Sequence, residues 1–326
     1  MKAVVNTSYG TPNVLEIKEV EKPSPKANEV LIRIHAAVVS SADCTFRKGV
    51  PYFARLFFGL LKPKTTILGT EFAGQIEAVG KDVKLFKPGD KVFAASGADF
   101  GAHAQYICLA EQGGLAIKPI NMTYEQSAAI CEGTLTALPF LRDKAKIKSG
   151  QKILINGASG SVGTAAVQLA KHFGAEVTGV CSTANLELVK SLGADRVIDY
   201  TTEDFTKGTE TYDVIFDTVG KSTFSQCKDR LKQGGVYLAC VLTLANLLQM
   251  LWTSQIASKK VIFDAAGLRP PGEKATDLAY IKELAEARAL KPVIDKTYTM
   301  EQIAEAHRHV DTGHKKGNVV LSLGDV

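Results

Sequence analysis

The most informative segment of the chain reads Lys152-Ile153-Leu154-Ile155-Asn156-Gly157-Ala158-Ser159-Gly160-Ser161-Val162-Gly163, and a helix-like run follows it to Phe173. A short apolar strand that enters a glycine-rich turn and opens a helix brings backbone N–H groups and the positive end of the helix dipole together. With Gly160 and Gly163 in register, the turn reads A-x-G-x-x-G, and Ala158 takes the position of the usual first glycine. Gly160 would let a pyrophosphate approach the backbone, and Gly163 would let the helix pack on the strand. The turn predicts a dinucleotide site.

The residues after this turn alternate between strand-like and helix-like patterns. Residues 176–181 and 196–199 read as strands, and residues 186–192 read as a helix between them that ends at Gly193. This βαβαβ order is the context that a dinucleotide turn requires, so a glycine turn in an ordinary α/β protein is the weaker alternative. Further strands are expected at residues 213–220, 234–239 and 260–263. The alternation predicts a doubly wound parallel sheet.

The regions on either side of this sheet have different patterns. Residues 1–120 hold short strand candidates, such as 31–39 and 72–80, separated by Pro and Gly turns, which predicts a small barrel-like β domain. Residues 121–143 read as a helix with Thr123 as its N-cap. Beyond Gly267, helices are expected at 275–289 and 300–310, and strands at 295–298 and 318–323. We therefore expect a β-rich domain at 1–121, a nucleotide-binding domain at 122–266, and a C-terminal return to the first domain at 267–326.

Composition excludes several classes of protein. At 326 residues the chain is long enough for two domains that each bury a core, and its apolar and charged contents are ordinary for a globular protein. The formal net charge of +5 is spread along the chain without a basic, aromatic-rich stripe, so we expect no nucleic-acid partner. The most apolar late segment, residues 241–252, is interrupted by polar residues and is too short to span a bilayer. We therefore expect no transmembrane segment.

The cysteines and the N-terminal residues bear on the compartment. Six cysteines are scattered without a C-x-x-C pair or a metal-ligand cluster, and we expect buried thiols in a reducing compartment. They are Cys44, Cys108, Cys131, Cys181, Cys227 and Cys240. The chain passes from Met1-Lys2 directly into Ala3-Val4-Val5, with no apolar stretch of signal-peptide length. A cytoplasmic location is the resulting expectation.

Four blocks of sequence carry a resemblance to a known family. They are Leu68-Gly69-Thr70-Glu71-Phe72-Ala73-Gly74, Phe86-Lys87-Pro88-Gly89-Asp90-Lys91-Val92, the turn at 157–163, and Lys190-Ser191-Leu192-Gly193-Ala194-Asp195 with Asp199-Tyr200. In this order they resemble the medium-chain dehydrogenase/reductase superfamily, most closely its zinc-independent quinone oxidoreductase-like members, the group of the chloroplast-envelope quinone oxidoreductase homologue and the reticulon-4-interacting protein. The resemblance covers nearly the whole chain. It implies an α/β fold in which a Rossmann doubly wound parallel sheet is inserted in a GroES-like, β-rich catalytic domain.

The residues at the family's zinc positions predict that no metal binds. By resemblance, zinc-dependent members use a Cys, a His followed by Glu, and a third Cys or Asp. Alignment puts Ser40 and Thr70 at the first two positions. It puts Glu132 at the third, directly after Cys131. Catalytic zinc needs three protein ligands and an open position, so at least two of the three are lost.

The end of the second predicted strand bears on the cofactor. NAD-preferring units place Asp or Glu there to bind the ribose hydroxyls, whereas this strand ends Val180-Cys181-Ser182-Thr183-Ala184-Asn185 without a carboxylate. Ser182 and Asn185 offer donors to a 2′-phosphate, and by resemblance Tyr200 contacts it. NADPH is therefore the expected cofactor. The alternative is that this uncharged loop does not influence which cofactor binds. The expected cofactor contacts are Thr136, Ala158, Ser159, Gly160, Ser161, Val162, Gly163, Ser182, Asn185, Tyr200, Val219, Leu242 and Asn318.

Without a metal to polarise an alcohol, hydride delivery to an already electrophilic acceptor is the easier reaction. Quinones and α,β-unsaturated carbonyls are such acceptors, and the apolar segments 53–61 and 242–252 suggest a hydrophobic one. By resemblance, Ser40 replaces a family asparagine near the nicotinamide, and Thr136 matches a threonine that touches it. Tyr52 is the candidate whose phenol would donate a hydrogen bond near the substrate. An aromatic side chain that only packs in the protein or lies on its surface is an equally good interpretation of Tyr52. These three residues are the candidate catalytic groups.

We therefore expect an NADPH-dependent reductase of quinones or activated alkenes that uses no zinc. Two alternatives remain open: a zinc-dependent alcohol dehydrogenase, and a regulatory protein that binds NADPH without turnover. The resemblance also implies a homodimer.

Overall fold

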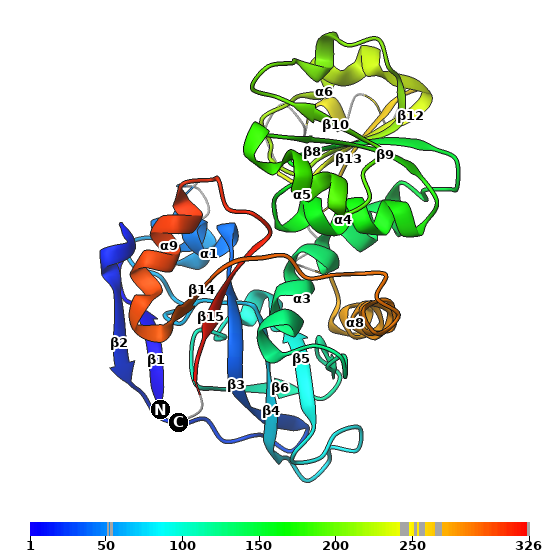
Figure 1. Ribbon diagram of the computed structural model, residues 1–326. Helices are drawn as coiled ribbons and strands as arrows, with labels where there is room; N and C mark the ends of the chain where they lie inside the picture. The colour runs from blue at the N-terminus through cyan, green and yellow to red at the C-terminus, as the bar shows by residue number, and fades with distance from the viewer. Residues whose placement is uncertain are drawn as a thin grey trace. The chain divides into compact units, whose positions relative to one another are not determined.

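The computed structural model describes residues 1–50, 52, 55–241, 248–250, 253, 258–264 and 269–324 (Figure 1). The chain divides into two compact units, which we call the β-rich unit (Met1–Glu132 with Gly267–Val326) and the parallel-sheet unit (Gly133–Ala266). The first division falls inside helix α3 (Tyr124–Pro139), later than the boundary at 121–122 expected from the sequence. The expected cofactor contact Leu242 lies outside the described residues.

The parallel-sheet unit contains one six-stranded sheet in the order β10-β9-β8-β11-β12-β13, with every neighbouring pair parallel. Counted from its first strand, this order is 3-2-1-4-5-6, the order of doubly wound dinucleotide-binding sheets, and it reverses between β8 and β11. The strands are β8 (Lys152–Asn156), β9 (Glu176–Cys181), β10 (Arg196–Asp199), β11 (Tyr212–Asp217), β12 (Leu231–Ala239) and β13 (Lys260–Phe263). The strands predicted at 176–181, 196–199 and 260–263 are confirmed.

The helices that the described residues define in this unit include α4 (Ser161–His172), α5 (Leu186–Ser191) and α6 (Phe224–Cys227), with 3-10 turns η5 (Thr183–Asn185), η6 (Phe205–Lys207) and η7 (Lys228–Arg230). Helix α3 continues into a π-helical turn, η4 (Phe140–Lys144). The predicted N-cap of α3 is confirmed, because the Thr123 hydroxyl accepts the Gln126 N–H (3.2 Å) and the Gln126 side chain accepts the Thr123 N–H (3.0 Å). Leu154, Ile215 and Tyr237, from three neighbouring strands, are buried in one core, as expected for a parallel sheet.

The β-rich unit holds a seven-stranded sheet with the path β14-β15-β3-β4-β5-β7, in which β6 also pairs with β3, and a second sheet of β1 and β2. The strands are β1 (Lys2–Asn6), β2 (Leu15–Glu19), β3 (Glu29–Val39), β4 (Glu71–Val79), β5 (Lys91–Ala95), β6 (Tyr106–Ala110), β7 (Leu115–Ile117), β14 (Ile294–Thr299) and β15 (Asn318–Ser322). Within the described ranges, the helices of this unit include α1 (Ser41–Lys48), α2 (Arg55–Phe58), α8 (Pro271–Glu286) and α9 (Ile303–Asp311), with 3-10 turns η1 (Pro12–Val14), η3 (Gly97–Asp99) and η9 (Met300–Gln302). Strand β15 lies antiparallel to β3, so the C-terminal segment completes a sheet begun near the N-terminus (Figure 1).

Several element boundaries differ by a few residues from the sequence expectation, and two of these differences have a clear physical cause. Helix α8 begins at Pro271, earlier than expected, because a proline is tolerated in the first turn, where its missing N–H would have no helical partner. Strand β11 ends at Asp217 rather than at Gly220, because the Asp217 carboxylate accepts backbone N–H groups of the following loop and turns the chain.

Cysteine burial and helix length bear on the expected compartment. All six cysteines are free, but Cys108 and Cys240 are only half-buried, so the expectation of six buried thiols is wrong for these two. Cys108 is the central residue of β6, in which alternate residues are only half-buried, and Cys240 directly follows β12. In the described part of the chain, no helix has both the length and the apolar character that crossing a bilayer requires.

A buried ion pair joins α1 to α9 within the β-rich unit. The Arg47 side chain has no exposed surface, and its Nη2 lies 2.6 Å from Oδ2 of Asp311, which also pairs with Lys48 at 2.7 Å. Removing one partner of such a pair leaves a buried charge without compensation.

We expect Asp311→Ala to lower the free energy of unfolding by about 3 kcal/mol. Thermal unfolding measures the effect as a lower melting temperature. The double variant Arg47→Met/Asp311→Leu removes both charges and should recover most of that loss. A double variant no more stable than Asp311→Ala would show that the stranded charge is not the cause.

Candidate functional site

The glycine turn joins β8 to α4, beside the point where the strand order reverses. Gly157 has φ +82°, a left-handed conformation that glycine adopts without steric cost, whereas Ala158 has no positive φ. Alanine is therefore tolerated at the usual position of the first glycine, because the left-handed residue lies one position earlier. The Ala158 side chain is fully buried, and its Cβ lies 3.0 Å from where a Cβ on Gly179 of β9 would be. Only the backbone of Ala158 is thus free to face a cofactor.

The start of α4 leaves room for a phosphate group. A Cβ on Gly163 would lie 2.1 Å from the Gly157 carbonyl oxygen, so only glycine lets α4 approach β8 this closely. A Cβ on Gly160 would meet no atom nearer than 3.6 Å, and Gly160 caps the helix without a side-chain hydrogen bond. The first-turn N–H groups, of Ser161, Val162 and Gly163, are suited to bind phosphate oxygens.

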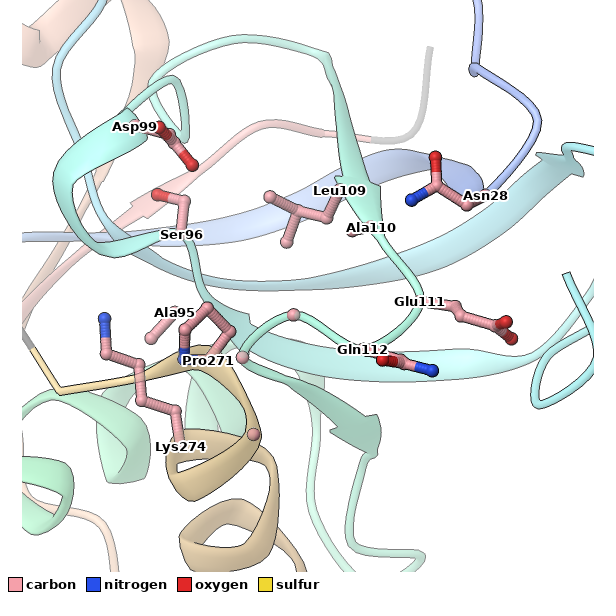
Figure 2. A pocket seen from close by; sticks show the side chains of 13 residues that line it. Asn28, Ala95, Ser96, Asp99, Leu109, Ala110, Glu111, Gln112, Pro271 and Lys274 are labelled. Carbon is pink, nitrogen blue, oxygen red and sulfur yellow. The ribbon is translucent and has the colours of Figure 1, made fainter.

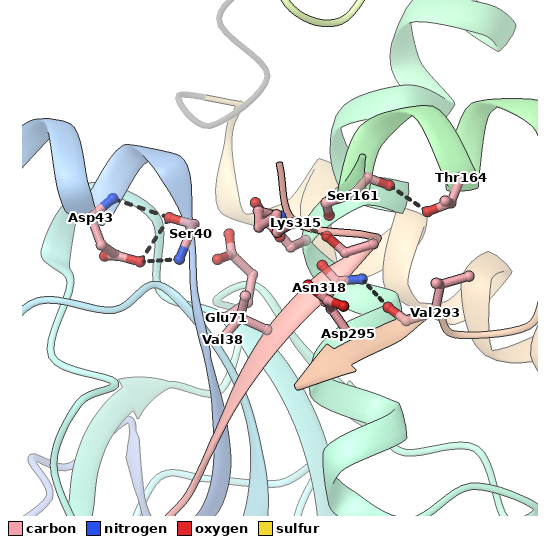
Figure 3. Close-up of polar contacts among 12 residues, drawn as sticks. Val38, Ser40, Asp43, Glu71, Ser161, Thr164, Val293, Asp295, Lys315 and Asn318 are labelled. Atoms are coloured by element: carbon pink, nitrogen blue, oxygen red, sulfur yellow. Dashed lines mark hydrogen bonds and ion pairs between the residues drawn. The ribbon is translucent and has the colours of Figure 1, made fainter. Parts of the chain in front are cut away.

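Helix α3 touches this turn at Gly133. A Cβ on Gly133 would lie 2.2 Å from the Ser161 carbonyl oxygen, so the two backbones are in contact. The same carbonyl accepts a hydrogen bond from the Thr164 hydroxyl at 3.0 Å (Figure 3). Thr136 is half-buried and lies three residues after Gly133, on the same helical face. The structure thus places Thr136 one helical turn from the contact with the dinucleotide turn.

Three of the expected cofactor contacts gather at the carboxyl ends of β9 and β10. Asn185 is 7% exposed, and its side-chain amide donates to the hydroxyls of Ser159 (3.0 Å) and Ser182 (3.2 Å). The Asn185 side-chain oxygen is buried and has no hydrogen-bond partner among the described residues. Tyr200 follows β10, and its N–H donates to the Cys181 carbonyl (3.1 Å). The loop after β9, the turn after β10 and the glycine turn therefore form one polar surface.

Sequence reasoning missed Asp217, at the carboxyl end of β11. Its carboxylate is 1% exposed and accepts hydrogen bonds from the Asn156 side chain of β8 (3.1 Å) and the Tyr237 hydroxyl of β12 (3.0 Å). It also accepts the N–H groups of Val219 and Gly220, both at 3.1 Å. These bonds fix the loop that carries Val219, an expected cofactor contact whose side chain is exposed. An acid that ends an apolar strand three residues before a glycine is the signal that could have found it.

In the β-rich unit, Ser40 lies buried at the junction of β3 and α1. Its hydroxyl donates to Asp43 Oδ2 (2.7 Å) and accepts the Asp43 N–H (3.1 Å), which caps α1 (Figure 3). Asp43 Oδ1 accepts the N–H of Gly69 at 2.8 Å, next to Thr70. Asp43, to which sequence reasoning gave no role, thus ties Ser40 to the segment that carries Thr70. The contact of Ser40 with a substrate stays a prediction.

Glu71, at the start of β4, has a raised pKa. Burial and the nearby charge of Glu132 raise the pKa of Glu71 from 4.5 to about 8. The charge of Asp43 adds to the rise, while the Thr70 hydroxyl, which donates to Glu71 Oε2 at 2.5 Å, and the charge of Lys274 oppose it. At neutral pH Glu71 is therefore largely protonated.

This acidity predicts a pH-dependent effect of Glu71→Gln. Because the folded state holds the Glu71 proton more tightly than the unfolded state, wild-type stability falls as pH rises from 4.5 to about 8. Glutamine stays neutral, so the melting temperature of Glu71→Gln, relative to wild type, should rise over that range and level off above it. Thermal unfolding at several pH values measures this difference.

The matched control is Glu305→Gln, at an exposed position of α9. Its melting temperature should follow that of the wild type at every pH. A constant difference between Glu71→Gln and wild type across the range would contradict the raised pKa.

Tyr52 and Asn318 also belong to the β-rich unit. Tyr52 is 73% exposed, and the Arg55 guanidinium lies 4.9 Å from the centre of its ring. Asn318 is buried at the start of β15, and its side-chain amide donates to the Val293 carbonyl at 3.1 Å (Figure 3). The expected roles of Tyr52 as a phenol donor and of Asn318 as a cofactor contact stay predictions.

A cavity of about 560 Å³ opens in the β-rich unit beside β5. Figure 2 shows Lys274 reaching from the first turn of α8 toward Ala95 and Ser96, with Asp99 and Glu111 also in the wall. The Ser96 N–H donates to the Thr70 carbonyl (2.9 Å), so the wall is continuous with the segment that carries Glu71. The lining mixes charged and polar side chains with apolar ones such as Leu109 and Pro271. The hydrophobic pocket expected from segments 53–61 and 242–252 stays a prediction, because these segments lie partly outside the described residues.

The residues at the expected third zinc position have protein partners. The Cys131 thiol donates to the Ala94 carbonyl (3.5 Å), and burial raises its pKa well above the ordinary value, which disfavours the thiolate that a metal needs. Glu132 lies 4.0 Å from the Lys315 ammonium. Within the described ranges, no group of three His, Cys, Asp or Glu side chains is arranged to hold a metal ion.

Comparisons with known proteins match both parts of the chain. Residues 26–120 match the alcohol dehydrogenase GroES-like domain, and residues 192–321 match the zinc-binding dehydrogenase family. A 2-methylene-furan-3-one reductase of Solanum lycopersicum is 33% identical over 339 residues, covering 98% of this chain and 79% of the relative. The chloroplastic quinone-oxidoreductase homolog of Spinacia oleracea is 33% identical over 334 residues, covering 98% of each chain. The solved structure of Escherichia coli quinone oxidoreductase complexed with NADPH has a TM-score of 0.85 and 26% identity, covering 99% of this chain and 100% of that one.

Proposed function

Because the chain belongs to the medium-chain dehydrogenase/reductase superfamily, among its quinone oxidoreductase-like members, we propose that it is an NADPH-dependent reductase of quinones or α,β-unsaturated carbonyls. The name of the tomato relative describes a ketone conjugated to an exocyclic alkene, and the spinach relative is named for a quinone. Both kinds of acceptor are electrophilic without a Lewis acid, so hydride transfer to them needs no zinc.

The main support for NADPH comes from the residues at the end of the dinucleotide site that would bind the ribose. Ser182, Asn185 and Tyr200 gather there, and β9 ends without the carboxylate that NAD-preferring enzymes use for the ribose hydroxyls. Asn185 joins this end to the glycine turn through Ser159, so donors for a 2′-phosphate and for the pyrophosphate belong to one surface. The similar Escherichia coli enzyme is described as a complex with NADPH.

The residues of the chain would bind and orient the cofactor. The first-turn N–H groups of α4 would hold the pyrophosphate, while Thr136 and Asn318 would contact the nicotinamide end. When bound, the nicotinamide supplies a hydride. Ser40 would lie near the acceptor, the Tyr52 phenol would donate a hydrogen bond to the oxygen that gains charge, and water would supply the proton.

Zinc independence is supported by the residue types at the ligand positions. Ser40 and Thr70 are poor zinc ligands, and their hydroxyls already bond to Asp43 and Glu71. A cytoplasmic location and a homodimer complete the proposal. The free cysteines support the first, and the family resemblance supports the second.

Stopped-flow mixing of the purified protein with NADPH and a panel of quinones and enones tests the activity. We expect NADPH absorbance to fall with at least one acceptor, in protein that contains less than stoichiometric zinc by metal analysis. Oxidation of an alcohol by protein with one bound zinc would favour a zinc-dependent alcohol dehydrogenase. NADPH binding without transfer to any acceptor would favour a regulatory protein.

A carboxylate introduced at the end of β9 tests the cofactor preference. Ser182→Asp should weaken NADPH binding by about tenfold or more, because its charge repels the 2′-phosphate, and should leave NADH binding equal or tighter. Fluorescence titration measures both affinities. Ser191→Asp, on the exposed end of α5, adds the same charge away from the loop and should change neither. Equal effects of Ser182→Asp on both cofactors would contradict a 2′-phosphate site here.

A further inference from the structure

The ribose end of the proposed site has no carboxylate at the end of β9, but it has one at the end of β10, that of Asp199. Asp199 is the last residue of β10, and its register partner is Cys181, the last residue of β9. Because the carboxyl ends of parallel strands meet at one edge of the sheet, Asp199 lies beside the loop that begins at Ser182. An acid at this place either opposes a 2′-phosphate or supports the residues that bind it.

The contacts of Asp199 show what its carboxylate does in the protein. Oδ2 accepts the Thr183 hydroxyl at 2.5 Å, while Oδ1 accepts the N–H (2.9 Å) and the hydroxyl (2.7 Å) of Thr201. The hydroxyl oxygens of Thr183 and Thr201 are 3.0 Å apart. The hydrogen bond from Thr183, followed by those from Thr201, lowers the pKa of Asp199, so the group is ionised at neutral pH. One carboxylate therefore ties the loop after β9 to the turn after β10.

The loop is held from its other side by Asn185. The Asn185 amide bonds to Ser159 in the glycine turn and to Ser182 at the start of the loop. Tyr200 lies between Asp199 and Thr201, the two residues joined by the carboxylate bonds, so those bonds also fix its backbone. Loop 182–185 is thus clamped between the glycine turn and the β10 turn.

We propose that Asp199 is a positioning residue for the cofactor, which acts through Thr183 and Thr201 to hold Ser182, Asn185 and Tyr200 ready for a 2′-phosphate. Its role thus differs from that of a carboxylate at the end of β9, which accepts the ribose hydroxyls, because its bonds to Thr183 and Thr201 direct its oxygens toward the protein. This role rests on the proposed function, since it presumes that NADPH is the cofactor.

Direct binding of NADPH and NADH to Asp199 variants tests this role without turnover. We expect Asp199→Ala to raise the Kd for NADPH about tenfold and to leave the Kd for NADH within about twofold, because NADH lacks the phosphate that the clamped residues bind. Asp199→Asn keeps an oxygen that can accept a threonine hydroxyl and should show a smaller loss. Thr183→Val should weaken NADPH like Asp199→Ala, and the double variant should be no weaker than Asp199→Ala alone.

The chain offers a matched control at Asp204. Its carboxylate accepts the N–H (3.0 Å) and the hydroxyl (2.7 Å) of Thr206, the same Asp-x-Thr arrangement as Asp199 and Thr201, but neither Asp204 nor Thr206 is bonded to loop 182–185. Asp204→Ala should leave both Kd values unchanged. Melting temperatures of all variants, measured in parallel, separate loss of fold from loss of affinity.

Four outcomes would count against the positioning role or its premise. Tighter NADPH binding by both Asp199→Ala and Asp199→Asn would mean that the carboxylate acts by repulsion. Equal weakening of NADPH and NADH would mean that it acts on the ribose hydroxyls or on the whole site. An unchanged Kd for NADPH in Asp199→Ala would overturn the positioning role alone. Absence of NADPH binding by the parent protein would instead overturn the proposed function.

Discussion

The contact between α4 and the turn after β8, at Gly163, is the constraint on which the proposed dinucleotide site depends. Any side chain at Gly163 would collide with the Gly157 carbonyl and push the helix away from the strand edge. Two other parts of the site contact the residues around Gly163. Helix α3 contacts the carbonyl of Ser161 through Gly133, and Asn185 bonds to the Ser159 hydroxyl. A displacement of α4 would therefore move the proposed phosphate donors and, through Ser159 and Asn185, loosen the loop at 182–185.

The sheet could be predicted from sequence because its signals are local. A run such as 176–181 is apolar, short and flanked by turn residues, and the structure has a strand over those same residues. The turn was also correctly placed, but the reason that alanine is tolerated at position 158 lies in the left-handed Gly157 before it. Backbone angles of this kind do not follow from a motif's spacing.

The full roles of the supporting acids could not be predicted, because some of their partners are distant along the chain. Asp217 bonds to Asn156, 61 residues away, and Asp43 bonds to Gly69, 26 residues away. A single sequence shows that an acid is present but not which N–H groups or hydroxyls surround it. Residues that contact a cofactor are recognised by motif, whereas residues that hold those contacts in place become visible only when the strands are assembled.

In the β-rich unit, buried acids lie at or beside the positions that were aligned with the ligands of zinc-dependent family members. Two carboxyl groups, Glu71 and Glu132, are close enough that both cannot be charged at low cost. Glu132 has an ammonium group near it in Lys315, and Glu71 keeps its proton at neutral pH. The charge of these two acids is thus offset by the ammonium groups of Lys315 and Lys274 and by the proton on Glu71.

The pairing of β15 with β3 has a consequence for biosynthesis. Val39 and its partner Val319 are separated in the chain by the whole parallel-sheet unit, so β3 leaves the ribosome long before β15 is made. At ordinary elongation rates this interval is on the order of tens of seconds. Throughout it, the apolar half of β3 has an unpaired edge, the kind of edge at which nascent chains associate wrongly. The sheet of the β-rich unit can therefore be completed only after the inserted unit has been synthesised.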